Sequence, residues 1–282
     1  MKKVSFTKMH GAGNDFVLID DRAETFPAHD HILLATFAAN RTGIGCEGVI
    51  LVQPSKVADF KMVFFNPDGT EADLCGNGAR CVAAFAREIG AAKSPAMTFE
   101  TRAGLVDAEV YDNGSVKIWM PEPKNRRYGL KVALKGRPPI AGDYVEAGVP
   151  HLVVPCDSVA TIDVNGLGRE LRLADAFAPN GTNVDFVQFS PPHKAVLRTY
   201  ERGVEAESGA CGTGAVATAV VAVETKGLSL PIHVRTSQGY DLVVDGDWRH
   251  AKSTGFTLTG PVKKGFEGVI DLDELDTGNE ME

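Results

Sequence analysis

The feature that most constrains this chain is an internal repeat, because duplicated segments are expected to fold in the same way twice. Residues 71–83 read EADLCGNGARCVA and residues 207–219 read ESGACGTGAVATA, so that Glu, Cys, Gly, Gly, Ala and Ala coincide at an offset of 136. Four ordered matches of this kind indicate two copies of one unit. The other three stand at an offset of 135 and are 12–17 with 147–152, 48–53 with 183–188, and 94–104 with 229–239.

The residues around each repeated cysteine indicate an α/β unit. The runs 60–65 and 195–200 have the apolar, aromatic and β-branched side chains that are typical of strands. Each run is followed by a loop, by the tetrapeptide Cys-Gly-x-Gly, and by an alanine-rich segment that ends at Gly90 or Gly227. Because these segments are apolar on nearly every side, we expect two buried helices.

The expected fold is therefore α/β (α+β), with two pseudo-symmetric repeats that each place a curved mixed β-sheet around a buried central helix. A chain of 282 residues suits two domains, since domains of roughly 100–150 residues are the most common. We expect the first domain to comprise residues 1–121, with 264–282 returning to it, and the second to comprise 122–263. Two prolines, Pro121 and Pro123, stand at the junction.

Composition narrows the class of partner and the compartment. The net charge of -8 argues against a nucleic-acid partner, which would favour a basic surface. No uncharged apolar run approaches the about 18–20 residues that span a bilayer, and the first residues lack the apolar segment of a signal peptide. Five cysteines without a CxxC pair fit neither a disulfide framework nor a zinc site. We therefore expect a cytoplasmic protein with reduced thiols, no metal and no membrane partner.

The chemistry is expected at Cys75 and Cys211, which each stand immediately before a predicted helix among glycines. A helix N-terminus carries about half a positive charge and unpaired N–H groups. Such an environment lowers the pKa of a cysteine and also binds a carboxylate. Two pseudo-symmetric copies would hold one carboxylate between two thiols. That arrangement suits inversion of a stereocentre, in which a base acts on one face of the carbon and an acid on the other.

The chain resembles the diaminopimelate epimerase family over nearly its whole length. The two cysteine segments carry the specific likeness, and four shorter segments support it. The matching segments are MHGAGNDF (9–16), NPDGTEADLCGNGARC (66–81), PH (150–151), NVDF (183–186), ERG (201–203) and ACGTGA (210–215). The resemblance implies an isomerase that uses neither pyridoxal phosphate nor a metal. It implies interconversion of LL- and meso-2,6-diaminopimelate for lysine and peptidoglycan synthesis. The expected partners are this small-molecule amino acid and, at most, a second copy of the chain in a homodimer.

The resemblance also implies a role for each matching residue. Cys75 and Cys211 are expected to be the two acid–base groups, assisted by His151 and Glu201. Arg202 is expected to hold the distal carboxylate, as its planar guanidinium suits. We match His151 to Asp15 in the repeat. The full set expected to bind substrate is Asn14, Asn66, Gly76, Asn77, Asn183, Glu201, Arg202, Gly212 and Thr213.

One departure from the family pattern leaves the substrate open. The family often has Asn before the Pro-His pair, where this chain has Val149. Another cofactor-independent amino-acid racemase or isomerase of the same fold is therefore the alternative, and a nonenzymatic small-molecule binding protein is the more remote one.

Overall fold

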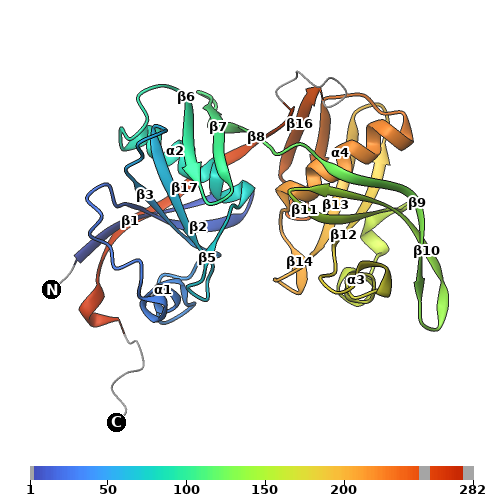
Figure 1. Cartoon of the computed structure of the whole chain (residues 1–282), viewed down its shortest axis with the longest axis horizontal. Helices are drawn as coiled ribbons and strands as arrows, with labels where there is room; N and C mark the ends of the chain where they lie inside the picture. The colour runs from blue at the N-terminus through green and yellow to red at the C-terminus, as the bar shows by residue number, and fades with distance from the viewer. Residues whose placement is uncertain (1–2, 248–254, 276–282) are drawn as a thin grey trace, which may run out of the picture. The chain divides into compact units, whose positions relative to one another are not determined.

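The computed structural model describes residues 3–247 and 255–275, and Figure 1 shows the course of the chain. The chain divides into two compact units. Unit 1 comprises Met1–Ile118 with Pro261–Glu282, and unit 2 comprises Trp119–Gly260. Of the segment expected to return to the first repeat, residues 276–282 lie outside the described residues. None of the helices in the described ranges has the length and apolar character that crossing a bilayer requires.

Unit 1 is a mixed β-sheet closed around one helix. Its sheet runs in the order β1–β2–β3–β4–β6–β7–β8, and only the pairs β2–β3 and β4–β6 are parallel. The long strand β17 pairs with both β1 and β8, which closes the sheet into a barrel. The elements are β1 (Lys3–Gly11), β2 (Asn14–Asp20), α1 (His31–Ala38), β3 (Val49–Gln53), β4 (Phe60–Phe65), β5 (Glu71–Ala72), α2 (Gly76–Glu88), β6 (Ala96–Thr101), β7 (Gly104–Val110), β8 (Ser115–Trp119), β17 (Gly255–Asp271) and η3 (Leu272–Glu274).

Unit 2 repeats this plan around a second helix. Its strands follow the order β9–β10–β11–β12–β13–β15–β16–β17, with β11–β12 and β13–β15 parallel. Figure 1 shows the central helices of the two units, α2 and α4, each among the strands of its own unit. The elements are β9 (Lys124–Leu134), β10 (Arg137–Ala147), β11 (Val149–Pro155), η1 (Val159–Thr161), α3 (Val164–Arg172), η2 (Asp175–Phe177), β12 (Asn183–Ser190), β13 (Lys194–Glu201), β14 (Ala206–Ser208), α4 (Gly212–Lys226), β15 (Ile232–Arg235) and β16 (Asp241–Asp247).

The strand registers show that the sequence repeat is a structural repeat. Val17 pairs with Val49 in unit 1, and Leu152 pairs with Val184 in unit 2, which is the same pairing shifted by 135 residues. The same shift relates the pair Phe60–Phe99 to the pair Ala195–Val234. The register also corrects one expected match.

That correction concerns His151. His151 directly precedes Leu152, and Phe16 directly precedes Val17, so His151 occupies the position of Phe16 and the match to Asp15 was wrong. This position holds the buried phenyl ring of Phe16 in unit 1 and the buried imidazole of His151 in unit 2.

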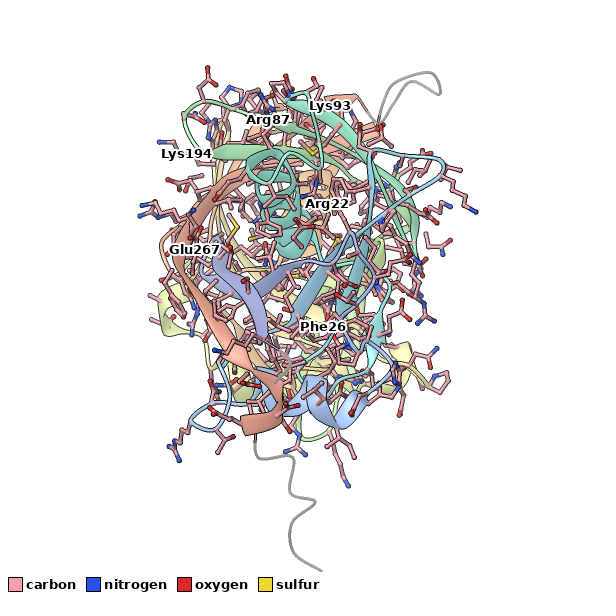
Figure 2. The ribbon with its side chains drawn as sticks, turned by 90° about the vertical axis from the view of Figure 1, so that its left-hand side faces the viewer. Arg22, Phe26, Arg87, Lys93, Lys194 and Glu267 are labelled. Carbon is pink, nitrogen blue, oxygen red and sulfur yellow. The ribbon has the colours of Figure 1, made fainter. Side chains whose placement is uncertain are left out.

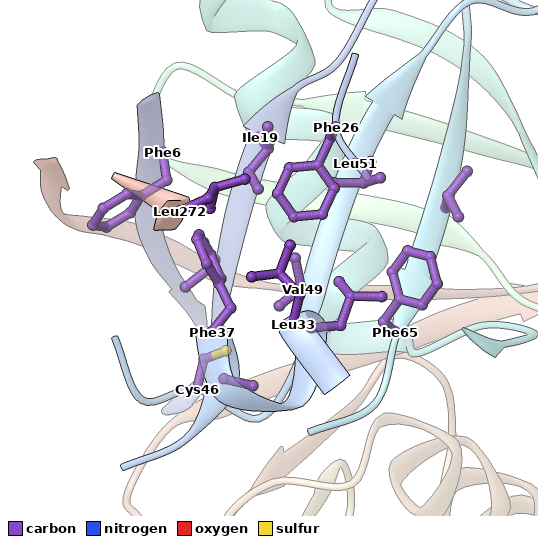
Figure 3. Packing of buried hydrophobic residues seen from close by; sticks show 14 residues of the cluster. Phe6, Ile19, Phe26, Leu33, Phe37, Cys46, Val49, Leu51, Phe65 and Leu272 are labelled. Atoms are coloured by element: carbon purple, nitrogen blue, oxygen red, sulfur yellow. The ribbon is translucent and has the colours of Figure 1, made fainter. Parts of the chain in front are cut away.

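The central helices are buried because both are rich in small apolar residues. Helix α2 packs against β1, β2, β3, β4 and β7, and α4 packs against β10, β11, β12, β13, β15 and β16. On its other face the unit 1 sheet packs on α1 through a cluster of aromatic and aliphatic side chains that includes Phe6, Phe26 and Phe37 (Figure 3). The unit 1 sheet therefore packs on both faces, against α2 on one and against α1 on the other. This packing holds the strands around α2 in place.

The C-terminal end of α2 carries basic residues, which suits the negative end of a helix dipole. Arg22 donates a hydrogen bond to the carbonyl of Ile89 at 3.2 Å, and Arg87 donates one to the carbonyl of Lys93 at 3.1 Å. Figure 2 shows Arg22, Arg87 and Lys93 around this end of the helix. The opposite end of α2, where Cys75 lies, is therefore the end at which N–H groups point outward.

Candidate active site

The two cysteines occupy equivalent positions at the N-termini of the two central helices. Cys75 is the N-cap of α2 with φ −125° and ψ 123°, and Cys211 is the N-cap of α4 with φ −108° and ψ 109°. In this extended conformation the cap residue stands outside the helix, and the N–H groups of the first turn have no acceptor in a preceding turn of the helix. Each unit therefore presents one sulfur beside one set of backbone donors. We call these the unit 1 and unit 2 half-sites.

Glycine in the first turn of each helix allows a close approach to the strand next to it. A Cβ atom on Gly78 would lie 3.0 Å from Ile50 Cδ1, and one on Gly214 would lie 2.6 Å from Asp185 Oδ1. The helix starts thus rest directly on β3 and β12. Since Ile50 and Asp185 are related by the 135-residue shift, the same strand position supports both helix starts, with carbon in one unit and a carboxylate in the other.

In the unit 2 half-site a chain of polar groups leads from the sulfur of Cys211 into the interior. The sulfur accepts the N–H of Gly214 at 3.3 Å and lies 3.4 Å from Thr213 Oγ1. Thr213 Oγ1 lies 2.9 Å from His151 Nε2. His151 Nδ1 lies 2.7 Å from Asp185 Oδ2, and neither side chain is exposed.

The carboxylate of Asp185 fixes the roles of this chain. A carboxylate only accepts, so Nδ1 of His151 donates to it, which leaves Nε2 as the ring atom that faces Thr213 and can accept from it. The Thr213 hydroxyl can then donate to Nε2 and accept from the thiol of Cys211. Thr199 Oγ1 donates to the other carboxylate oxygen of Asp185 at 2.7 Å. Sequence reasoning placed His151 and Thr213 in the site but missed Asp185 and Thr199, although Asp185 stands inside the NVDF segment.

Burial raises the pKa of Cys211 well above its ordinary value, and the negative charges of Glu201 and Asp185 add to this effect. The hydrogen bond with Thr213 and the one from the N–H of Gly214 act in the opposite direction but are weaker. The expectation that the helix N-terminus would lower the pKa of this cysteine was therefore wrong. The helix end is present, but desolvation of a side chain that is only 5% exposed outweighs it.

Asn183, Glu201 and Arg202 lie beside this chain of groups at the ends of β12 and β13. Asn183 Oδ1 accepts the backbone N–H of Arg202 at 2.7 Å, and its Nδ2 lies 3.4 Å from His151 Nε2. Asn183 thus holds the start of the loop that carries Arg202. The guanidinium of Arg202 donates to the carbonyl of Asn180 at 3.4 Å, and within the described ranges no protein carboxylate forms an ion pair with it.

In the unit 1 half-site the first turn of α2 is tied down by a buried arginine. Arg80 donates to Asn77 Oδ1 at 2.6 Å and to the carbonyl of Gly76 at 3.2 Å. Asn77 is buried, whereas Cys75 and Gly76 are half-buried. The turn next to Cys75 is therefore held from inside by a cation, while the turn next to Cys211 is supported by an anion.

Asn14 and Asn66 belong to the same unit but differ in how they are held. Asn14 begins β2, and its Oδ1 is buried without a hydrogen-bond partner among the described residues. Asn66 follows β4 in a turn, where its side chain donates to Thr70 Oγ1 at 3.1 Å. An orphan buried amide costs about 1–3 kcal/mol, which makes Asn14 the stronger candidate to meet a ligand.

The three other cysteines are packing residues. Burial raises the pKa of the Cys46 thiol to about 11 and raises the pKa of the fully buried Cys81 further. Cys156 packs beside the unit 2 core. Across 3–247 and 255–275, no three His, Cys, Asp or Glu side chains form a group that could hold a metal ion.

Comparison with known sequences identifies relatives over almost the full length. A family model described as diaminopimelate epimerase matches residues 6–125 and 144–264. The diaminopimelate epimerase of Aquifex aeolicus (strain VF5) is 41% identical, with 97% of this chain and 100% of that protein covered. The diaminopimelate epimerase of Flavobacterium psychrophilum is 35% identical, with 93% and 98% covered.

Solved structures share the architecture at low identity. A probable proline racemase from Agrobacterium radiobacter K84 superposes with a TM-score of 0.72 at 20% identity, covering 97% of this chain and 94% of that one. A phenazine biosynthesis protein of the PhzF family from Bacillus anthracis gives a TM-score of 0.71 at 17% identity, covering 96% and 100%. Together with the two matched ranges, these structures confirm the expected fold of two α+β repeats.

Proposed function

The chain belongs to the diaminopimelate epimerase family, and we propose that it interconverts LL- and meso-2,6-diaminopimelate with two cysteines, one of which removes the α-proton while the other delivers its own proton to the opposite face. One observation carries the mechanism: Cys75 and Cys211 cap equivalent helices in the two copies of a duplicated unit. A duplicated site whose halves face one substrate offers one sulfur to each face of the α-carbon. Inversion needs an acid and a base arranged in this way.

The first turns of α2 and α4 would bind the α-carboxylate. Their N–H groups, at Gly76 and Asn77 in one unit and Gly212 and Thr213 in the other, lie at the positive ends of two helix dipoles. As one sulfur removes the α-proton, negative charge develops on the carboxylate, and fixed donors stabilise it without reorganisation. The other sulfur then delivers its proton to the opposite face, so the pair has exchanged roles after one turnover.

Polar groups of both units would hold the rest of the substrate. The guanidinium of Arg202 can bind the distal carboxylate through two parallel hydrogen bonds. The absence of an ion pair to Arg202 among the described residues supports this role over a structural one. The orphan Oδ1 of Asn14 and the carboxylate of Glu201 are acceptors that suit ammonium groups.

His151 would assist Cys211 through Thr213. When Cys211 must act as a base, His151 can take up the proton that the thiol releases, because Asp185 stabilises the resulting imidazolium. The thiolate of a buried cysteine is otherwise costly, as the raised pKa of Cys211 shows. The reaction needs no bound cofactor in this scheme, and the composition predicts that it takes place in the cytoplasm.

A second candidate, inversion of a different amino acid, is favoured by Val149. This apolar residue begins β11, two residues before His151, at a position where the family often has an amide. A substrate with a less polar distal end would suit it better.

The test is α-proton exchange in D₂O with LL-diaminopimelate, meso-diaminopimelate and a panel of other amino acids, using protein dialysed against a chelator. We expect deuterium at the α-carbon and inversion of both diaminopimelate isomers, at a rate that added metal or pyridoxal phosphate does not raise. Exchange with another amino acid and not with diaminopimelate would favour the second candidate. No exchange with any of these amino acids would exclude both enzymatic candidates and favour a nonenzymatic small-molecule binding protein.

A further inference from the structure

Among the described residues, the largest fully buried side chain is a cation that has no role in the proposed chemistry. Arg80 is 0% exposed and lies on α2, five residues after Cys75. Its hydrogen bonds go to Asn77 and to the carbonyl of Gly76, and its Nε has no partner among the described residues. In the same ranges no carboxylate forms an ion pair with it. A guanidinium remains charged in proteins, and an uncompensated buried charge is strongly unfavourable.

Few groups near Arg80 can balance its charge. Burial lowers the pKa of Arg80, and the charges of Cys81 and Cys75 oppose that effect. Cys81 is fully buried and its raised pKa keeps it a neutral thiol. Asp15, whose charge also acts on Cys81, is already paired with Lys8 at 2.5 Å. Cys75, which is half-buried at the helix start, is the thiol that remains.

The duplicated unit supplies an internal comparison. The position equivalent to Arg80 in α4 is Val216, which is buried among apolar residues. Unit 2 instead buries Asp185, and its negative charge opposes ionisation of Cys211. The two half-sites therefore have opposite fixed charges next to otherwise equivalent sulfurs.

We propose that Arg80 is a positioning residue that locks the first turn of α2 and makes Cys75 the thiolate of the resting protein, with Cys211 as the thiol. The inference rests on the proposed function for its meaning in catalysis. It assigns the first proton abstraction to Cys75, and the first protonation to Cys211. Asn77 is held through its Oδ1, so its backbone N–H stays in the carboxylate-binding turn.

Alkylation by iodoacetamide, followed by mass spectrometry of the Cys75 and Cys211 peptides, tests the assignment without reference to turnover. The reagent is uncharged and reacts with thiolates, so the pH at which each rate reaches half its maximum reports ionisation, whereas the maximum itself also depends on how exposed the sulfur is. In the wild type we expect this midpoint to lie at least about one pH unit lower for Cys75 than for Cys211. Equal midpoints, or a lower midpoint for Cys211, would overturn the proposal, and this measurement needs no variant to fold.

The variants separate charge from packing. Arg80→Met should slow alkylation of Cys75 about tenfold or more and leave Cys211 within about twofold, whereas Arg80→Lys should keep most of the Cys75 rate. Arg87→Met, on the exposed end of the same helix, is the matched control and should change neither rate. Unchanged alkylation of Cys75 in a folded Arg80→Met protein would refute the role of the charge. Failure of the proposed function would appear separately, as a wild-type protein that shows this thiol asymmetry but does not exchange the α-proton of diaminopimelate.

Discussion

Around the sulfur of Cys211, unit 2 buries an imidazole and a carboxylate at positions that unit 1 fills with carbon. His151 stands where unit 1 has Phe16, and Asp185 stands where it has Ile50. Unit 1 places a buried cation, Arg80, on the helix itself. Residues of different charge thus surround two sulfurs that occupy equivalent backbone positions. Such an asymmetry favours one of the two ways of placing a single proton on the pair of sulfurs.

The sharpest prediction at the residue scale concerns the two cysteines. Replacing either Cys75 or Cys211 with Ala should lower epimerisation at least about a hundredfold, because a methyl group neither takes nor gives a proton. Each variant keeps one competent sulfur and should still eliminate halide from a β-chlorinated substrate analogue of one stereochemistry. The two variants should prefer opposite stereoisomers.

Halide release from both stereoisomers of the analogue gives the measurement, with Cys156→Ala as the control that keeps full activity. If both alanine variants prefer the same stereoisomer, the sulfurs share a face and the two-thiol mechanism is wrong.

A second prediction concerns Asp185. In Asp185→Asn the amide can accept from only one of its two donors, and it no longer stabilises a positive charge on His151. We expect kcat to fall about ten- to a hundredfold with a smaller change in KM, because the substrate does not contact Asp185 in the proposed mechanism. Steady-state kinetics in both directions measure this. Thr199→Val, which removes one donor to the same carboxylate, is the milder comparison, and a kcat within twofold of wild type for Asp185→Asn would exclude the relay.

At the scale of the elements, the starts of α2 and α4 hold the two cysteines of the proposed mechanism. Both helix starts could be predicted from the sequence. The expected strand 60–65 is β4, and both predicted helices begin at the glycine after the cysteine. These elements could be predicted because their signals are local: apolar and aromatic residues indicate the strand, and glycines indicate the helix starts. Asp185 was missed because its meaning depends on the register between β11 and β12, which brings it against His151. A polar residue within an apolar strand was the available signal.

The fit of each helix start onto its strand gives a prediction at this scale. In Gly214→Ala the new methyl group would lie 2.6 Å from Asp185 Oδ1, a buried and hydrogen-bonded atom that cannot move aside. We expect a loss of about 1–3 kcal/mol in the free energy of unfolding and a large loss of activity. Gly78→Ala would meet the end of the Ile50 side chain at 3.0 Å, which can adjust, so the loss should be smaller.

The matched control is Gly227→Ala, at the C-terminus of α4, where φ is 69° and no atom lies within 4 Å of the added carbon. It should cost about 1 kcal/mol through backbone strain alone and leave kcat unchanged. Urea unfolding and kinetics of the three variants separate strain from misplacement of Asp185. Equal activity in Gly214→Ala and Gly227→Ala would contradict the close packing of the helix start on Asp185.

At the scale of the whole molecule, the chain is two closed units that share one long strand. Strand β17 pairs with β16 in unit 2 from Gly255 to Thr259, and with β1 in unit 1 from Val262 to Asp271. The repeat in the sequence predicted two similar units, because matching segments recur in order. It could not predict this shared strand, which occurs once and has no counterpart in the repeat. A substrate site made from both half-sites would depend on how the two units meet. A measurement on the whole chain in solution is therefore needed to test it.

Oxidation of the two cysteines tests whether the half-sites meet. Two thiols that flank one carbon atom in the complex should reach disulfide distance when the substrate is absent. We expect mild hydrogen peroxide to take two electrons and two protons from Cys75 and Cys211, to abolish activity, and to yield a linked pair of peptides in the mass spectrum. Dithiothreitol should restore both the thiols and the activity.

Substrate present during oxidation should protect the protein, since it would lie between the sulfurs. The variant Cys156→Ala is the control and should form the same linked peptides. Oxidised protein whose links involve only Cys46, Cys81 or Cys156 would mean that Cys75 and Cys211 do not approach one another. In that event the two helix starts would be separate sites, and inversion through a shared carbon would have to be abandoned.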